Sequence, residues 1–200
     1  MTAPETTCEL SHHARKATTM ISTEKPLSIH STLRLLEQAE ELLSGLSHNR
    51  YKAEAPPAFP SSVGAHTRHI LDHYDSFLNG LERGFLDYHS RERDAETERN
   101  PDFAITRIQD LCSRFLEFNE TLAETPTRLV LRVSAEDPSE TVATNPEREL
   151  YFCQSHTIHH FAMIGMICRH LGHSLPEDFG LAPSTIAHRL ILTKSNQYAS

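Results

Sequence analysis

The sequence predicts an all-α fold, a four-helix bundle with a small β-hairpin before the last long helix and an extended C-terminal arm. Four segments carry apolar residues at helical spacing, and stretches rich in proline, glycine or charge separate them. With 200 residues the chain is long enough for one domain with a hydrophobic core. We expect residues 26–190 to form that domain, between a disordered leader (1–25) and a disordered C-terminus (191–200).

The first helix is expected over Leu27–Leu46, with Ser28 or Ser31 as its N-cap. The Pro56-Pro57 to Pro60 segment follows this helix and separates it from the next, because proline lacks an amide donor and disfavours helix in the residue before it.

The second helix is expected to start at a Ser61 or Ser62 cap and to run to about Arg83, with Gly84 as its C-terminal stop. Its apolar stripe has a row of histidines along one margin, at positions i, i+3 and i+7: His66, His69 and His73. This row should face a neighbouring helix. Periodicity alone favours His66 as the most buried of the three.

Residues 85–101 are dense in charge and poor in apolar residues, which is typical of a solvated loop. Their alternating signs would also suit a salt-bridged lid over a site on the bundle. A third helix is expected over residues 101–124. The β-branched segments 129–133 and 140–143 flank the turn-forming Asp137-Pro138-Ser139, a pattern that predicts a β-hairpin.

The fourth helix should open at Asn145, with Pro146 in its first position, and end near Leu171-Gly172. His156 and His160 lie one turn apart on its apolar face. Residues four apart on a helix have Cβ atoms about 5 to 6 Å from each other, so two imidazole nitrogens there can bind one divalent cation. A hydrogen-bonded pair of core histidines is the structural alternative.

The segment from residue 173 onward contains prolines that argue against a continuous helix, yet it is too apolar to be merely solvated. We therefore expect residues 179–186 to pack along the bundle as an extended arm.

Charge and hydropathy exclude several classes of function. Lys plus Arg number 19 and Asp plus Glu 27, a net charge of −8 that argues against binding to nucleic acid. Apolar runs are too short to span a bilayer, and no signal-peptide pattern opens the chain. The four cysteines show no CxxC spacing and are expected to be reduced. The sequence thus predicts a soluble cytoplasmic protein.

These elements resemble the DinB/YfiT-like superfamily of metal-dependent helical bundles over roughly residues 27–190. The resemblance rests on Ser62-Val63-Gly64 followed by His69, on the charged linker, and on the His-x-x-His-His motif of residues 156–160. In that family one histidine of the second helix and the two outer histidines of the late motif bind a divalent metal, which implicates His69, His156 and His160. The family motif continues with Arg and Gly, whereas this chain has Phe161-Ala162.

Four further residues are expected around such a site, as supports for the ligands or as contacts to a substrate: His66, His73, Glu149 and His159. Glu149 shares a helical face with His156 but lies two turns away, about 10 Å by the helical rise, which argues against a ligand role. His159 falls at the edge of the apolar arc. Periodicity favours His66 and the resemblance favours His69, so which of the two completes the ligand set stays open.

Three histidines on two facing helices leave positions on the ion for water or substrate, as in catalytic sites. The resemblance implies hydrolase or thiol S-transferase chemistry on a small molecule such as a low-molecular-weight thiol, with zinc, nickel or iron as the metal. The alternative is a non-catalytic metal-binding bundle with a structural, stress-sensing or metal-sensing role. The sequence leaves open whether the protein is a homodimer.

Overall fold

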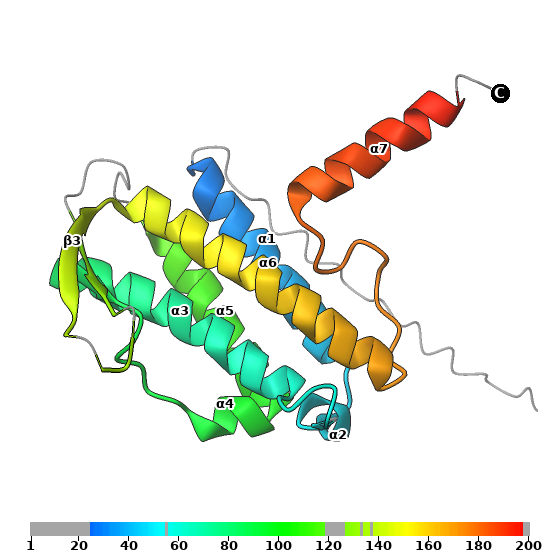
Figure 1. The fold of residues 1–200 in the computed structure, drawn as a ribbon, viewed down its shortest axis with the longest axis horizontal. Helices are drawn as coiled ribbons and strands as arrows, with labels where there is room; N and C mark the ends of the chain where they lie inside the picture. Colours follow the sequence, from blue (N-terminus) through cyan, green and yellow to red (C-terminus); the bar gives the residue numbers. More distant parts are fainter. Residues whose placement is uncertain (1–24, 55, 119–126, 133, 137, 198–200) are drawn as a thin grey trace, which may run out of the picture.

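A computed structural model describes residues 25–54, 56–118, 127–132, 134–136 and 138–197. The expected disordered leader is residues 1–25, and its residues 1–24 lie outside the described chain. Four long helices run side by side: α1 (Leu27–Ser44), α3 (Val63–Arg83), α5 (Pro101–Glu117) and α6 (Pro146–His170) (Figure 1). Helix α1 packs against α5 and α6, and α3 packs against α5 and α6. The predicted all-α four-helix bundle is confirmed.

The ends of α3 follow the local signals in the sequence. The Ser62 side chain accepts a hydrogen bond from the Ala65 amide at 3.1 Å, and Gly84 ends the helix with φ of 76°. Only glycine adopts this left-handed conformation without strain. The second predicted helix is therefore confirmed at both ends.

Helix α1 differs from the prediction at its start. It begins directly after Pro26, and no side chain caps its N-terminus. Ser28 lies inside the helix and is buried, and Ser31 is a helical residue too. The expected caps are wrong because proline, with its fixed φ, already sets the entry of the chain.

Two short helices close one end of the bundle, α2 (His48–Tyr51) and α4 (Ala95–Arg99). The Tyr51 hydroxyl donates a hydrogen bond of 2.6 Å to the Thr97 carbonyl, which joins the two. Helix α4 also lies against α3 at Gly64, where an added Cβ would come 2.0 Å from the Glu98 carbonyl oxygen.

A three-stranded sheet covers the opposite end, in the order β1-β2-β3. Strand β2 (Thr127–Leu131) pairs antiparallel with β3 (Glu140–Thr144), with Leu129 opposite Val142, which confirms the predicted hairpin. Strand β1 (Phe85–Asp87) adds in parallel to β2. This strand differs from the prediction, in which the charge-rich residues 85–101 form a solvated loop.

Helix α6 opens as predicted, with the Asn145 side chain accepting a hydrogen bond from the Arg148 amide at 2.9 Å. After α6 the chain folds back, and Phe179, only 4% exposed, stacks on Phe161 of α6 with ring centroids 5.1 Å apart. The predicted packing of the arm is thus seen at Phe179.

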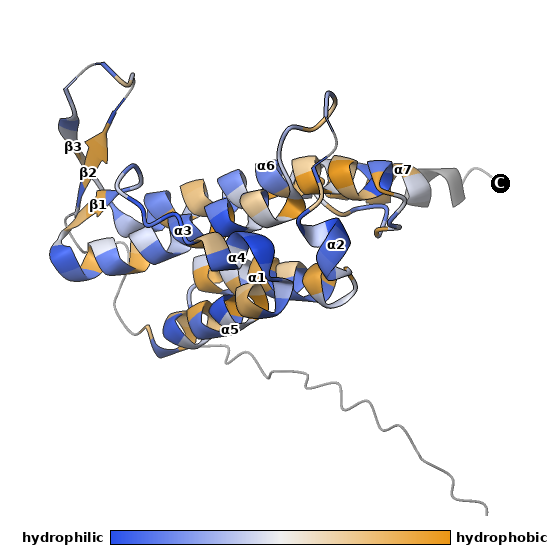
Figure 2. Cartoon of the chain, turned by 90° about the horizontal axis from the view of Figure 1, so that it is seen from below, coloured by the Kyte–Doolittle hydropathy of each residue, from blue (hydrophilic) through white to orange (hydrophobic). Residues whose placement is uncertain are grey.

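Beyond this contact the structure corrects the prediction of an extended arm. Residues Pro183–Gln197 form helix α7, so residues 191–197, expected to be disordered, are helical, and residues 198–200 lie outside the described chain. Helix α7 extends beyond the end of the bundle (Figure 1) and carries apolar residues there (Figure 2). A single proline at its first position is compatible with a helix, because an N–H is not needed there.

Within the described ranges, no helix combines the length and the apolar character needed to cross a bilayer. Cys153 and Cys168 are buried free thiols, and Cys112 is a partly buried one.

Candidate metal centre

Helices α3 and α6 face each other along the middle of the bundle and bring five histidines together: His66, His69 and His73 from α3, and His156 and His160 from α6. Both expected histidine rows therefore lie on the faces that meet. Their ring centroids lie 4.3 to 5.1 Å apart for the pairs that cross from one helix to the other.

Two other Nε2 atoms lie close to the Nε2 atom of His156. The Nε2 atom of His156 lies 2.9 Å from that of His69 and 3.1 Å from that of His160. A ring nitrogen carries either one hydrogen or one lone pair, so the Nε2 of His156 can form one linear hydrogen bond. It has two nitrogen neighbours, an arrangement that suits a shared cation better than hydrogen bonding alone.

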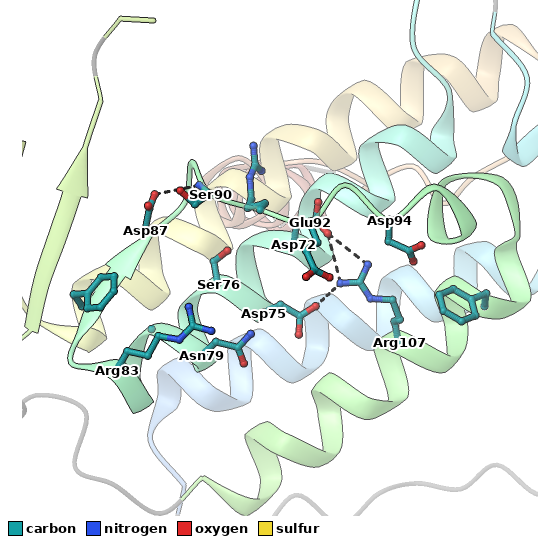
Figure 3. A pocket seen from close by; sticks show the side chains of 14 residues that line it. Asp72, Asp75, Ser76, Asn79, Arg83, Asp87, Ser90, Glu92, Asp94 and Arg107 are labelled. Atoms are coloured by element: carbon teal, nitrogen blue, oxygen red, sulfur yellow. Dashed lines mark hydrogen bonds and ion pairs between the residues drawn. The ribbon is translucent and has the colours of Figure 1, made fainter. Parts of the chain in front are cut away.

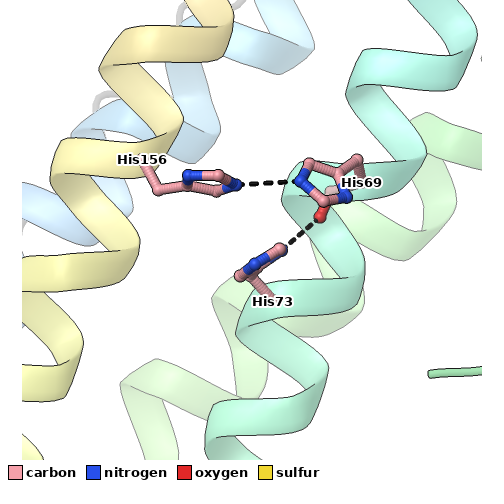
Figure 4. Close-up of side chains that lie close together, drawn as sticks. All are labelled: His69, His73 and His156. Atoms are coloured by element: carbon pink, nitrogen blue, oxygen red, sulfur yellow. Dashed lines mark hydrogen bonds between the residues drawn. The ribbon is translucent and has the colours of Figure 1, made fainter. Parts of the chain in front are cut away.

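His73 provides a second way to complete a group of three. His69, His73 and His156 each offer one ring nitrogen, and these nitrogens all lie within 4.8 Å of one another (Figure 4). The Nδ1 atom of His73 lies 2.8 Å from the His69 carbonyl, which can only accept, so Nδ1 carries the hydrogen. The lone pair of a neutral His73 is then on Nε2. A hydrogen bond of this kind orients many metal-binding histidines.

The structure places the remaining expected residues as follows. His66 is 8% exposed, and its Nδ1 lies 2.9 Å from the Nδ1 of His160, so it contacts the group from behind His160. His159 is exposed, and its ring centroid lies 5.3 Å from that of His160 and 6.4 Å from that of His156.

Glu149 lies apart from the histidines, near the start of α6. Its buried carboxylate accepts hydrogen bonds from Thr144 at 2.6 Å and from Arg148 at 2.7 Å. Its side chain also interacts with that of Tyr88, which stacks on His73, so its expected role beside the site stays a prediction.

Sequence reasoning missed Arg91, which comes from the charged segment between β1 and α4. Its Nη1 atom lies 2.7 Å from Nδ1 of His69 and 3.1 Å from Nδ1 of His73. Tyr88, from the same segment, stacks on His73 with an interplanar angle of 17°. The segment thus covers the histidines, in agreement with the lid that its alternating charges suggested. The only signal in the sequence was that run of charges.

Burial keeps these histidines neutral. Desolvation is the largest cause in each case, and it lowers the pKa of His69 to about 2, of His160 to about 3 and of His73 to about 4. The pKa values of His66 and His156 are lowered for the same reason. Neutral imidazole is the form that binds a metal ion.

A cavity of about 690 Å³ (Figure 3) adjoins this group through Arg91, which is one of its lining residues. Most of its carboxylates already have partners. Arg107 pairs with Asp72 and Asp75, and Asp75 also pairs with Arg114 at 2.7 Å. These ion pairs join α3 to α5 and hold the wall of the cavity.

Comparison with known proteins agrees with this architecture. The family model described as "DinB superfamily" matches residues 32–164, which is more than half of the chain. The chain belongs to the DinB superfamily. A crystal structure of a DinB-like protein from Bacillus cereus shares the fold, with a TM-score of 0.52 and 14% identity over 74% of this chain and 93% of that one.

A relative from Rhizopus delemar, named FK506-binding protein 5, is 36% identical over 104 residues. The match covers 52% of this DinB-superfamily chain and 27% of the relative, so the chain spans about a quarter of that protein's length. The histidine group of this DinB-superfamily bundle is compatible with a divalent metal ion.

Proposed function

We propose that this chain is a metal-dependent enzyme of the DinB type, in which His69, His156 and His160 hold one divalent cation. The observation that carries the proposal is the position of the His156 Nε2 atom, 2.9 Å from that of His69 and 3.1 Å from that of His160. The residues fit the ion chemically, because neutral imidazoles suit zinc, nickel or iron.

The surroundings support a position open to a substrate. His69 and His156 are partly exposed, whereas His160 is 8% exposed and lies deeper between the helices. The described residues close to the group are further histidines, Arg91 and aromatic rings, and no carboxylate joins the set that could hold an ion. Three ligands on one side of an ion leave room for water or a thiolate.

A divalent cation lowers the pKa of a bound water or thiol and so supplies a nucleophile near neutral pH. The residues of the chain would orient and shield it. The hydrogen bond from His73 to the His69 carbonyl fixes the His73 ring, and Tyr88 stacks over that ring. The proposed reaction is hydrolysis or S-transfer on a small molecule such as a low-molecular-weight thiol.

The first experiment measures the metal content of protein purified without a polyhistidine tag, by equilibrium dialysis against zinc and atomic spectroscopy. His69→Ala, His156→Ala and His160→Ala should each lose most of the metal at neutral pH. His66→Ala should cost about 10- to 100-fold in affinity, as expected for a residue that orients a ligand. The exposed His159→Ala is the matched control and should bind as the wild type does.

The same series distinguishes the two ligand sets. Loss of metal in His73→Ala together with retention in His160→Ala would assign the ion to His69, His73 and His156. Full metal content in His69→Ala and in His156→Ala would overturn the proposal and leave these as hydrogen-bonded core histidines.

A second experiment distinguishes an enzyme from a purely structural or sensing metal site. The protein is loaded with Co²⁺, and its visible absorption is followed while 2-mercaptoethanol is added. An open position admits the thiolate, and a sulfur-to-cobalt charge-transfer band appears. An unchanged spectrum would indicate a closed site and favour the non-catalytic role.

A further inference from the structure

Arg91 occupies an unusual position for a cation, in direct contact with the proposed metal ligands. It makes two hydrogen-bond contacts among the described residues, both to ring nitrogens of α3 histidines. Within the same part of the chain, no carboxylate lies in ion-pair distance of its guanidinium. The carboxylate whose charge acts on Arg91 is that of Asp72, which already forms an ion pair with Arg107.

The two contacts of Arg91 are not equivalent. An arginine can only donate. The Nδ1 of His73 already donates to the His69 carbonyl, so it cannot also accept from Arg91. The single acceptor for the guanidinium is therefore the Nδ1 of His69, at 2.7 Å.

This hydrogen bond determines where the proton of His69 sits. With Nδ1 as acceptor, a neutral His69 carries its hydrogen on Nε2, the atom that points at His156 (Figure 4). A nitrogen with a hydrogen cannot bind a cation. When Nε2 of His69 binds a cation, the hydrogen moves to Nδ1 and faces the donor groups of Arg91. The arginine contact and the metal contact of His69 exclude each other.

We propose that Arg91 is the anion-binding, specificity-determining residue of this site: it bonds His69 while no cation is bound and turns to a substrate carboxylate once a divalent cation is held. The inference rests on the proposed metal site. A cation releases the guanidinium from its single acceptor and leaves a partly buried charge without a partner. A carboxylate matches the planar fork of arginine with two parallel hydrogen bonds.

The local charges favour an anion at Arg91 rather than deeper in the cavity. Arg68 and Arg93 add positive charge near its guanidinium. The rest of the cavity lining holds five carboxylates and two arginines, Arg83 and Arg107, so it is acidic and would repel a second anionic group. The substrate class is thus a molecule with one carboxylate close to the group that binds the ion.

The test uses zinc and benzoate as probes, after zinc binding by the full chain has been measured. Isothermal titration should show benzoate binding at least tenfold tighter in the zinc-loaded wild type than in the metal-free protein. By linkage, benzoate should raise zinc affinity by the same factor. Arg91→Gln should lose at least tenfold in benzoate affinity, and Arg91→Lys should fall between, since it keeps the charge without the fork. The exposed Arg99→Gln, on α4, is the control.

Zinc affinity measured without benzoate tests whether the hydrogen bond from Arg91 to His69 competes with the cation. Arg91→Gln should bind zinc about 3- to 10-fold more tightly than the wild type, because it removes a hydrogen bond that competes with the metal. Equal benzoate affinity in wild type and Arg91→Gln, or benzoate binding that does not depend on zinc, would overturn the inference and leave the metal site intact. Failure of the wild type to bind zinc would instead overturn the proposed function.

Discussion

The metal-free protein should lose stability as the pH falls from 7 to 5, because buried neutral histidines bind protons more readily in the unfolded chain. His73 and His160 are 5% and 8% exposed, and their pKa values in the folded protein are about 4 and about 3. The unfolded value is about 6.5. A lowered pKa of a base means that the unfolded state holds more protons between these values, so the stability rises with pH and is complete above about pH 6.5.

The magnitude follows from the same values. A histidine with a pKa of about 6.5 unfolded and about 4 folded contributes about 2 kcal/mol less to stability at pH 5 than at pH 7. His73 and His160 together should lower the free energy of unfolding by about 4 kcal/mol, which for a chain of this length is a fall in melting temperature of about 8 to 16 °C.

The assay is thermal unfolding followed by circular dichroism at 222 nm, in EDTA-treated protein at constant ionic strength and at pH 7, 6 and 5. His73→Gln should melt lower at pH 7 but lose about half as much between pH 7 and 5, because one buried base is gone. His159→Gln, at an exposed position, should follow the wild type. A melting temperature that stays constant from pH 7 to pH 5 would refute the reasoning.

Two further predictions concern packing. Gly64→Ala should lower the free energy of unfolding in urea by about 1 to 3 kcal/mol, because its Cβ would lie 2.0 Å from the Glu98 backbone oxygen. The Cβ of the control variant, Gly45→Ala, would meet no atom closer than 3.7 Å, so its free energy of unfolding should change by less than about 0.5 kcal/mol. Phe179→Ala should cost about 3 to 5 kcal/mol by the same measurement if the arm holds to the bundle, while Leu190→Ala, at a position 59% exposed on α7, should cost less than about 0.5 kcal/mol. Equal effects within either pair would contradict the packing described above.

The parts of the fold that follow from local signals were predictable from the sequence. Ser62 and Gly84 fix the two ends of α3, and Asn145 with Pro146 fixes the start of α6, because caps and φ preferences act within a few residues. Strand β1 was not predictable in this way. Its three residues pair with a strand about 40 positions later, and no local pattern encodes such a partner.

The candidate site, too, was predictable from the sequence only in part. Helical spacing placed His69 and His156 on faces that meet, because periodicity reports which side of a helix is buried. It could not choose between His66 and His69 as the ligand from α3, since that depends on ring rotation and on the approach of two helices. The contact of Arg91 with His69 was not predictable from the sequence, because it depends on how the β1–α4 segment crosses the bundle.

The contact between His69 and His156 joins residues 87 positions apart, and β1, α4, α5, β2 and β3 all lie in the chain between them. A cation shared by these two side chains would therefore act as a cross-link that closes a long loop. Closing a loop of about 87 residues costs about 4 to 5 kcal/mol of chain entropy at 25 °C, on the model used for disulfides. The fold brings the two histidines together before any ion binds, so the proposed ion would not have to overcome this cost. Because the ion would leave the unfolded chain, it would stabilise the protein by an amount that grows with its free concentration.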